Sequence, residues 1–541
     1  MKKTVFLWAF LFTYFASFAQ LQRPKLVIGI VVDQMRWDYL YRYYNKYSDD
    51  GFKRLLNDGY NCANTLINYL PAYTAVGHTT IFTGSVPSID GIAGNNWRFQ
   101  NSGKMTYCTD DSTVATVGAE GDAGKMSPHN LWVTTITDEL RLATNFKSKV
   151  IGVSLKDRAS ILPAGHNPTG AFWLDDASGN FITSSYYMND LPAWVKAFNQ
   201  EKDINKLIRN GWNTLLPIGQ YSESTKDNVP WEGKLSGADT PTFPFNLKKA
   251  LEKDKGSIRS TPFGNTLTLQ FAQAAINGEK LGQGDNTDFL TINCASTDYV
   301  GHMTGPNSIE IEDVYLRLDR DLGVFLKMLD AKVGKGNYLV FLTADHGSAH
   351  SKGFMKENKM PTGFFPDLQK SLNSYLQEKF GTEKLVLGME NDEVSFNNAA
   401  IEMKGLAKEA IKKATINFLQ KQNGILYAVD ESMAAIAPIP AALREMIING
   451  YNRERSGDIK IILQSGWLPS QYKTGTTHGL WNPYDTHIPL IFMGWKIPHG
   501  ETNNTLYMTD IAPTLAALLH IQMPSGCIGK PIEPLMDKVN K

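Results

Sequence analysis

The segment Leu26-Val27-Ile28-Gly29-Ile30-Val31-Val32 is followed immediately by Asp33. Seven residues without a polar side chain predict a strand that is buried on both faces, which is typical of parallel sheets. Further apolar runs recur along the chain and are expected to be strands of the same kind: Val150–Leu155, Phe289–Cys294, Tyr338–Thr343 and Ile488–Met493. Helical periodicity lies between them, for example from Asp313 to Asp330. The pattern predicts an α/β fold, a mostly parallel sheet with helices on both faces.

Two segments interrupt this alternation of strands and helices. Residues from about 163 to 260 are rich in Trp, Pro, Asn and Gly and show weak periodicity. Residues from about 352 to 473 carry helix and strand signals of their own. We interpret both as α+β insertions that cap the active-site end of one catalytic domain, which spans residues 20–541.

Composition excludes several classes of protein. The 541 residues contain 54 Lys and Arg against 54 Asp and Glu, so the formal net charge is zero. No overall positive field is present to hold a polyanion, so a dedicated nucleic-acid partner is not expected. No protein partner is evident from the sequence. Four cysteines without a Cys-x-x-Cys pair exclude a disulfide scaffold. Whether Cys62 and Cys108 form a disulfide is left open.

The N-terminus has the pattern of a secretory signal peptide. Two lysines follow Met1, an apolar stretch runs from Val5 to Phe18, and small residues precede Ala19. The 14-residue stretch is shorter than the roughly 20 residues that a membrane span needs. We therefore expect residues 1–19 to be removed and the mature protein to be exported to the periplasm without a membrane anchor.

Charged and metal-binding side chains follow four of the apolar runs. The carboxyl ends of strands in an open α/β sheet form the ligand crevice, so these side chains are expected to meet at one edge. One such residue could simply lie in a solvated loop, but four sets of charged residues, each directly after an apolar run, are poorly explained in this way. The residues are Asp33, Lys156-Asp157-Arg158, Asp298 with His302, and Asp345-His346.

Several of these residues have the chemistry of metal ligands. Asp298 and His302 are four residues apart, which places them on one face of a helix, and their oxygen and nitrogen atoms suit a zinc-type cation. Asp345 and His346 can both bind only where the strand breaks into a turn, and Gly347 supplies that break. A further histidine is needed. His478 lies in a loop and is preferred to His487, which is expected at the wrong edge of the sheet.

Thr74 is the candidate nucleophile. It lies where a loop is expected to enter a helix, and a helix start favours an incoming anion. A threonine hydroxyl needs an adjacent metal to become a good nucleophile. Lys156 and Arg158 would point the same way in an extended segment and suit a group with two negative charges. Either Asn95 or its neighbour Asn96 would donate a further hydrogen bond to a phosphoryl oxygen.

The order and surroundings of these residues resemble the alkaline phosphatase superfamily. The likeness rests on residues 31–39, 154–160, 295–302 and 508–514, together with Thr74, Asp345, His346 and His478. It covers nearly the whole mature chain, and its combined motifs are specific. Within the superfamily, the chain is most similar to the flavobacterial-type, phosphate-irrepressible periplasmic alkaline phosphatases.

The resemblance implies a phosphate monoesterase with two zinc ions per chain. One ion would be held by Asp298, His302 and His478. The other would be held by Asp33, Asp345 and His346, with the oxygen of Thr74 beside it. Thr74 would form a phosphothreonine intermediate. The non-bridging phosphoryl oxygens of a small-molecule monoester would be held by Asn95, Lys156 and Arg158.

Three other functions share some of these features. A phosphodiesterase or nucleotide pyrophosphatase of the same superfamily would share the metal ligands and the threonine, but it would have less use for the Lys156 and Arg158 pair. A sulfatase would need a Cys or Ser in place of Thr74. A non-catalytic metal- or phosphate-binding protein would tolerate the loss of Thr74.

Overall fold

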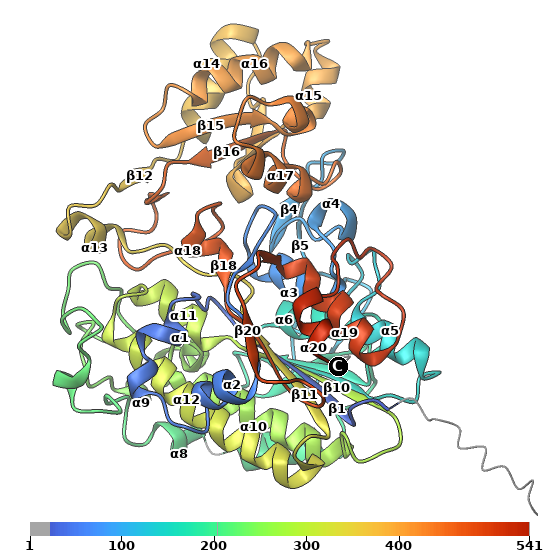
Figure 1. The fold of residues 1–541 in the computed structure, drawn as a ribbon. Helices are drawn as coiled ribbons and strands as arrows, with labels where there is room; N and C mark the ends of the chain where they lie inside the picture. Colours follow the sequence, from blue (N-terminus) through green and yellow to red (C-terminus); the bar gives the residue numbers. More distant parts are fainter. Residues whose placement is uncertain (1–21, 203, 540–541) are drawn as a thin grey trace, which may run out of the picture.

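A ten-stranded sheet forms the centre of the molecule (Figure 1). The structure is a computed structural model that describes residues 22–202 and 204–539. The predicted signal peptide, residues 1–19, lies outside the described residues. The strands follow in the order β20 (Gly500–Thr502), β2 (Tyr60–Cys62), β19 (Leu490–Gly494), β11 (Tyr338–Thr343), β1 (Leu26–Val32), β10 (Asp288–Cys294), β7 (Val150–Val153), β8 (Gly170–Leu174), β9 (Phe181–Ser184) and β6 (Thr116–Val117).

The five strands from β11 to β8 are parallel, and their carboxyl ends share one edge. Val32 of β1 pairs with Cys294 of β10, and Val31 pairs with Thr343 of β11. β1 is buried along its whole length, as its unbroken apolar sequence predicts. This register brings the residues after β1, β10 and β11 to the same place.

Helices cover both faces of the sheet, which confirms the predicted α/β fold. One group contains α10 (Pro262–Glu279), α11 (Ser296–Thr304) and α12 (Ile309–Leu329), which contact one another. A second group contains α3 (Thr74–Thr83), α5 (Ile136–Ala143), α6 (Asp157–Ala164) and α19 (Ile511–Leu519). The two groups lie on opposite sides of the sheet in Figure 1.

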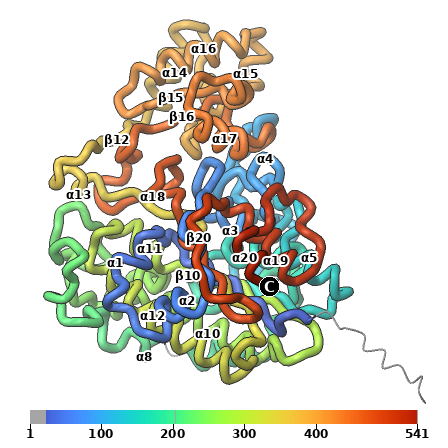
Figure 2. Tube along the Cα trace, in the orientation of Figure 1, coloured from blue at the N-terminus to red at the C-terminus, as the bar shows by residue number. Residues whose placement is uncertain are grey.

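Residues 352–473 contain a second sheet, in the order β13 (Val386–Gly388), β14 (Glu393–Phe396), β16 (Ile459–Leu463) and β15 (Ile425–Asp430). α14 (Gln369–Phe380) and α16 (Lys408–Leu419) pack with this sheet around an apolar cluster of their own. Figure 2 shows this segment, in yellow to orange, at one end of the molecule, with α10 and α12 at the other end. In the other interrupting segment, β8 and β9 are strands of the main sheet, so residues 170–184 are part of the core rather than of a cap.

Two predicted strands have different bounds in the structure. The run from Val150 ends at Val153, because Ser154 and Leu155 already lead into α6. The run Ile488–Met493 is divided at Pro489, which has no N–H to donate to a ladder. Its first part, β18 (His487–Ile488), pairs with β3 (Thr65–Leu66) in a separate sheet.

Two further observations concern the predictions about cysteine and membranes. Cys62 and Cys108 are both buried free thiols, and they belong to different apolar clusters. Within the described part of the chain, no helix has both the length and the apolar character needed to cross a membrane.

Candidate active site

Six predicted metal ligands form two groups at the carboxyl edge of the sheet. Asp298, His302 and His478 form one group, and Asp33, Asp345 and His346 form the other. The ligand atoms within each group lie within 4.8 Å of one another. Asp33 follows β1, Asp345 follows β11, and Asp298 lies in the first turn of α11, which begins just after β10. The topology of the parallel sheet therefore assembles the site from distant parts of the sequence.

The first group is held on one helix and one loop. Oδ1 of Asp298 lies 3.2 Å from Nε2 of His302, as expected for residues one helical turn apart. His478 reaches the same oxygen from its loop at 3.8 Å. The two groups are adjacent, because the rings of His346 and His478 stack with their centroids 3.4 Å apart.

The three histidines are oriented for metal binding. Nδ1 of each ring donates a hydrogen bond to a backbone carbonyl: His302 to Thr476, His346 to Gly347 and His478 to Ala72, over 2.8–3.0 Å. These bonds fix the tautomer and leave Nε2 as the atom that can bind a cation.

Two carboxylate oxygens of the second group are unsatisfied by the protein. Oδ1 of Asp33 and Oδ2 of Asp345 are buried and have no hydrogen-bond partner among the described residues. A buried ionised oxygen without a partner is costly, and a divalent cation would satisfy both. The donor set of carboxylate oxygen and imidazole nitrogen is that of zinc sites. The residues present therefore fit the predicted pair of cations.

Burial and neighbouring charges shift the pKa values of the candidate ligands. Burial, with the neighbouring carboxylate of Asp345, raises the pKa of Asp33. Burial lowers the pKa of His346 and, together with the other two imidazoles, that of His478. Burial alone would raise the pKa of Asp298, but Lys156 and His302 lower it well below its usual value. Neutral His346 and His478 and an ionised Asp298 are the forms that bind metal. Burial alone would lower the pKa of His302, but the adjacent Asp298 raises it above its usual value.

Thr74 is the first residue of α3, at the helix start that the sequence predicts. Its Oγ1 lies 3.5 Å from Nε2 of His346, and its side chain is buried. α3 can approach this closely because residue 77 is glycine: a Cβ there would collide with the backbone of Asp345. The candidate nucleophile and the second ligand group are thus in direct contact.

Asn95 contacts the start of α3, next to Thr74, and Lys156 contacts both ligand groups. Oδ1 of Asn95 accepts a hydrogen bond of 2.9 Å from the N–H of Ala75, whereas Asn96 is exposed. The structure therefore places Asn95, and not Asn96, beside the candidate nucleophile. Nζ of Lys156 lies 2.8 Å from Oδ2 of Asp33 and 2.7 Å from Oδ2 of Asp298.

The reason given for pairing Lys156 with Arg158 was wrong. The chain is not extended there, because α6 begins at Asp157; Lys156 is the residue before this helix and Arg158 lies in its first turn. Arg158 donates a 3.0 Å hydrogen bond to the hydroxyl of Tyr107. Asp157 accepts hydrogen bonds from Thr109 and from the hydroxyl of Tyr107, the same hydroxyl that Arg158 contacts, so the side chains of Asp157 and Arg158 are not directed apart.

The reason given for rejecting His487 was also wrong. β19 is antiparallel to β11, so its amino end lies at the carboxyl edge of the parallel strands. His487 is absent from both groups because it lies in β18, where its Nε2 donates to the carbonyl of Ala63 and its ring stacks on Trp37. Gly347 also has another role than the one predicted: the carbonyl of Tyr484 leaves no room for a Cβ there.

Sequence reasoning missed three residues that hold the ligands in place. Gln34 donates from its backbone N to Oδ1 of Asp345 (3.1 Å) and from its side chain to Oδ1 of Asp298 (2.6 Å), so it joins both groups. Asn293 donates to Oδ2 of Asp33 over 3.2 Å. His78 donates to the carbonyl of Thr74, and its Nδ1 lies 3.4 Å from Oδ2 of Asp345. Only His78 had a signal in the sequence, its spacing of one helical turn from Thr74.

One family profile and several known proteins match this chain over most of its length. The profile of the family described as Type I phosphodiesterase / nucleotide pyrophosphatase matches residues 27–487. Alkaline phosphatase PafA of Elizabethkingia meningoseptica is 58% identical over 519 residues, 95% of either chain. The crystal structure of wild-type PafA superimposes with a TM-score of 0.94 and covers 95% of this chain and 99% of that one.

Two further relatives are similar over nearly their whole length. A protein of Myroides odoratus named calcium-transporting ATPase is 52% identical over 97% of this chain and 98% of its own. Alkaline phosphatase PhoV of Synechococcus elongatus is 53% identical over 95% of this chain and 93% of its own. The chain therefore belongs to the type I phosphodiesterase/nucleotide pyrophosphatase family of the alkaline phosphatase superfamily.

Proposed function

We propose that the protein is an alkaline phosphatase that hydrolyses phosphate monoesters through a phosphothreonine intermediate on Thr74. The observation that carries the proposal is the contact of the Thr74 hydroxyl with one of two adjacent groups of metal ligands. The names of the relatives PafA and PhoV support the same activity. We propose two zinc ions as cofactors, one held by Asp298, His302 and His478 and the other by Asp33, Asp345 and His346.

When bound, the two cations supply positive charge that lowers the pKa of the attacking hydroxyl and stabilises the departing oxygen. Thr74 carries out the first displacement: its Oγ1 forms a bond to phosphorus as the bond to the alcohol oxygen breaks on the opposite side. In the second displacement, water attacks the phosphothreonine and releases phosphate and the free hydroxyl. Thr74 lies at the start of α3, and the positive end of the helix dipole favours the anionic phosphoryl group there.

Lys156, Arg158 and Asn95 are proposed to hold the non-bridging phosphoryl oxygens. A monoester carries two negative charges at alkaline pH, and two cationic side chains match that charge better than they match a diester. Lys156 now bonds to two of the ligand carboxylates. With those carboxylates engaged by metal, its ammonium is free to donate to the substrate. Arg158 is held beside it by Tyr107.

Phosphodiester or pyrophosphate cleavage is the second candidate, because the matching family profile is named for it. Metal analysis and a comparison of monoester with diester turnover, on one zinc-loaded preparation, test the proposal. Two zinc ions per chain with faster monoester turnover are expected. Faster diester turnover would favour the second candidate. Full activity after all zinc is removed would rule out the site itself.

The location of the protein and its domain boundaries are also proposals. The N-terminal pattern supports export to the periplasm. The second sheet and the separate apolar cluster of residues 352–473 support an insertion there. Secretion of a fusion that carries residues 1–19 would test the first of these.

A further inference from the structure

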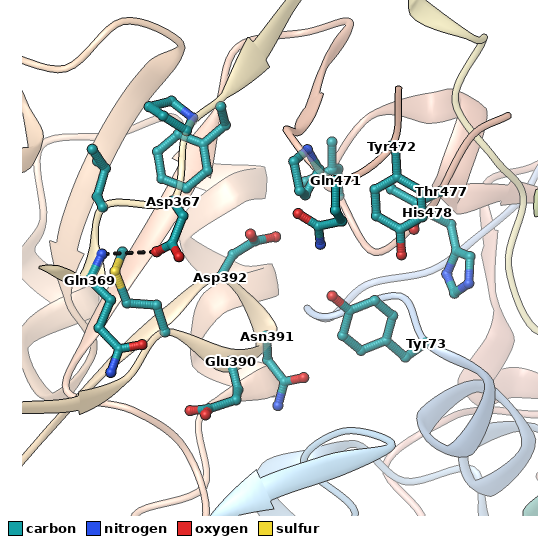
Figure 3. Close-up of a pocket in the computed structure, with 16 residues that line it drawn as sticks. Tyr73, Asp367, Gln369, Glu390, Asn391, Asp392, Gln471, Tyr472, Thr477 and His478 are labelled. Carbon is teal, nitrogen blue, oxygen red and sulfur yellow. Dashed lines mark hydrogen bonds between the residues drawn. The ribbon is translucent and has the colours of Figure 1, made fainter. Parts of the chain in front are cut away.

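A cavity of about 400 Å³ lies between the candidate active site and the segment 352–473 (Figure 3). Its volume is within the range of small-molecule sites, about 300–1,000 Å³. It is lined on one side by residues of the active site and on the other by residues of that segment: Tyr73, Thr477 and His478, and members of 365–369, 389–392, 469–472 and Leu480.

The cavity ends at a proposed metal ligand. His478 lines it, is 7% exposed, and makes no hydrogen bond through its Nε2 in the described structure. His478 belongs to the group that does not contain His346, the ligand in contact with Thr74. In-line attack places the departing oxygen opposite the attacking one. If the proposed function holds, the alcohol part of the substrate therefore leaves on the side of this cavity.

One wall of the cavity is aromatic. The ring of Tyr73 meets the ring of His478 edge-on, with centroids 5.5 Å apart. The ring of Tyr472 stacks near His302 at 6.3 Å. Figure 3 shows both tyrosines beside His478, facing the carboxylate side chains of the opposite wall.

The opposite wall is acidic. Asp367, Glu390 and Asp392 line the cavity, and no lysine or arginine does. Arg98 balances Glu390 through an ion pair of 2.8 Å. Asp367 and Asp392 have no ion pair in the described part of the chain, and the neighbouring Lys460 already bonds to Glu393. Burial raises the pKa of Asp392 to about 6, so its carboxylate is ionised at neutral and alkaline pH.

We propose that this cavity binds the alcohol part of the monoester and selects alcohols that carry a positive charge, such as an alkylammonium group. Aromatic faces attract quaternary ammonium ions, and two unpaired carboxylates add an attraction that an uncharged or anionic alcohol does not feel. Asp367, Asp392 and Tyr472 would then be specificity-determining residues.

The test compares two substrates of nearly the same shape on the zinc-loaded, full-length protein. Phosphocholine carries the charge, and 3,3-dimethylbutyl phosphate is its uncharged carbon analogue. The ratio of their kcat/KM values is measured in the wild type and in Asp367→Asn/Asp392→Asn. Asparagine keeps the acceptor that Asp367 offers to the N–H of Gln369 and tolerates the positive φ of Asp392.

The ratio should fall about fivefold in the double variant, because each partly exposed charge contributes a few-fold. Glu402→Gln, which removes an exposed charge of the same segment outside the cavity, should leave the ratio unchanged.

Calorimetric binding of both compounds to Thr74→Ala, with and without the two asparagines, gives a measure that does not depend on turnover. Phosphocholine binding should weaken about fivefold more than binding of its analogue.

The outcomes separate the two proposals. If both substrates are hydrolysed and neither the ratio nor the binding responds to the asparagines, the charge selection is wrong and the monoesterase proposal stands. If neither substrate is hydrolysed by the zinc-loaded protein, the proposed function is wrong and the selection fails with it. Should the double variant not fold, Tyr472→Leu serves instead: it should lower the same ratio, and an unchanged ratio would overturn the selection.

Discussion

Nζ of Lys156 lies 2.7 Å from Oδ2 of Asp298, and both side chains are buried. The same ammonium lies 2.8 Å from Asp33, so a single lysine connects the two groups of metal ligands. It provides the positive charge that these carboxylates require when no cation is present. Lys156 therefore has two expected roles, one in the stability of the metal-free protein and one in binding the substrate.

Lys156→Ala should destabilise the metal-free protein by about 3 kcal/mol, because it leaves two buried carboxylates without a counter-charge. The zinc-loaded protein should lose much less, since the cations then neutralise them. Urea unfolding with and without a chelator measures both values. Lys327→Ala, which breaks an exposed pair with Asp50, is the control and should have little effect in either form. Equal losses for Lys156→Ala in both forms would show that it does not substitute for the cations.

Lys156→Ala should also lower kcat/KM for a monoester about tenfold more than for a diester with the same leaving group. The monoester has one more negative charge for the ammonium to bind. Steady-state kinetics on both substrates measure the difference. Equal losses on the two would mean that Lys156 does not bind the additional charge.

Gln34→Ala should weaken zinc binding at least about tenfold, because the glutamine donates to a carboxylate of each ligand group. Its backbone donor remains in the variant, so the loss measures the side chain. Gly301→Ala should act in the same direction, since a Cβ there would collide with Oε1 of Gln34. Competition with a coloured chelator measures the affinity, and the exposed Gln377→Ala is the control. Unchanged affinity in both site variants would show that Gln34 does not position the ligands.

The sequence pointed to five of the six candidate ligands because Asp33, Asp298, His302, Asp345 and His346 follow buried parallel strands, which all end at the same edge; His478 lies in a loop and has no such signal. It predicted Thr74 because a helix start has a recognisable sequence. The expected extended backbone at Lys156 and Arg158 was wrong, because the end of β7 is set by the turn into α6 and not by the apolar run. The role of Gln34 was not predicted, because it depends on a positive φ of 62°, and a glutamine in a sequence gives no sign of that backbone conformation. The cavity was not predicted because its walls come from segments that only the tertiary structure brings together.

Glu310→Gln should stabilise the protein at pH 9 and change little at pH 5. Glu310 is 1% exposed, and both of its carboxyl oxygens lack partners in the described structure. Burial raises its pKa to about 8, and burial with the charge of Glu310 raises that of Glu232. An acid with a raised pKa binds more protons in the folded state, so its contribution to stability falls as the pH rises from about 4.5 past 8.

The neutral glutamine avoids this loss, and the gain at pH 9 should be at least about 1.4 kcal/mol, the free energy of one pKa unit. Urea unfolding at the two pH values measures it. Glu402→Gln, an exposed site, is the control. A gain that is the same at pH 5 and pH 9 would mean that Glu310 does not titrate in this range.

In the proposed mechanism, the phosphoryl group is transferred to Thr74 before it reaches water. Each in-line displacement inverts the configuration at phosphorus, so transfer through Thr74 requires two inversions. The most direct test is the stereochemical course of transfer from a monoester that is chiral at phosphorus, through three oxygen isotopes, to an acceptor alcohol. Net retention is the predicted result. Net inversion would show a single direct displacement and would contradict a phosphothreonine intermediate.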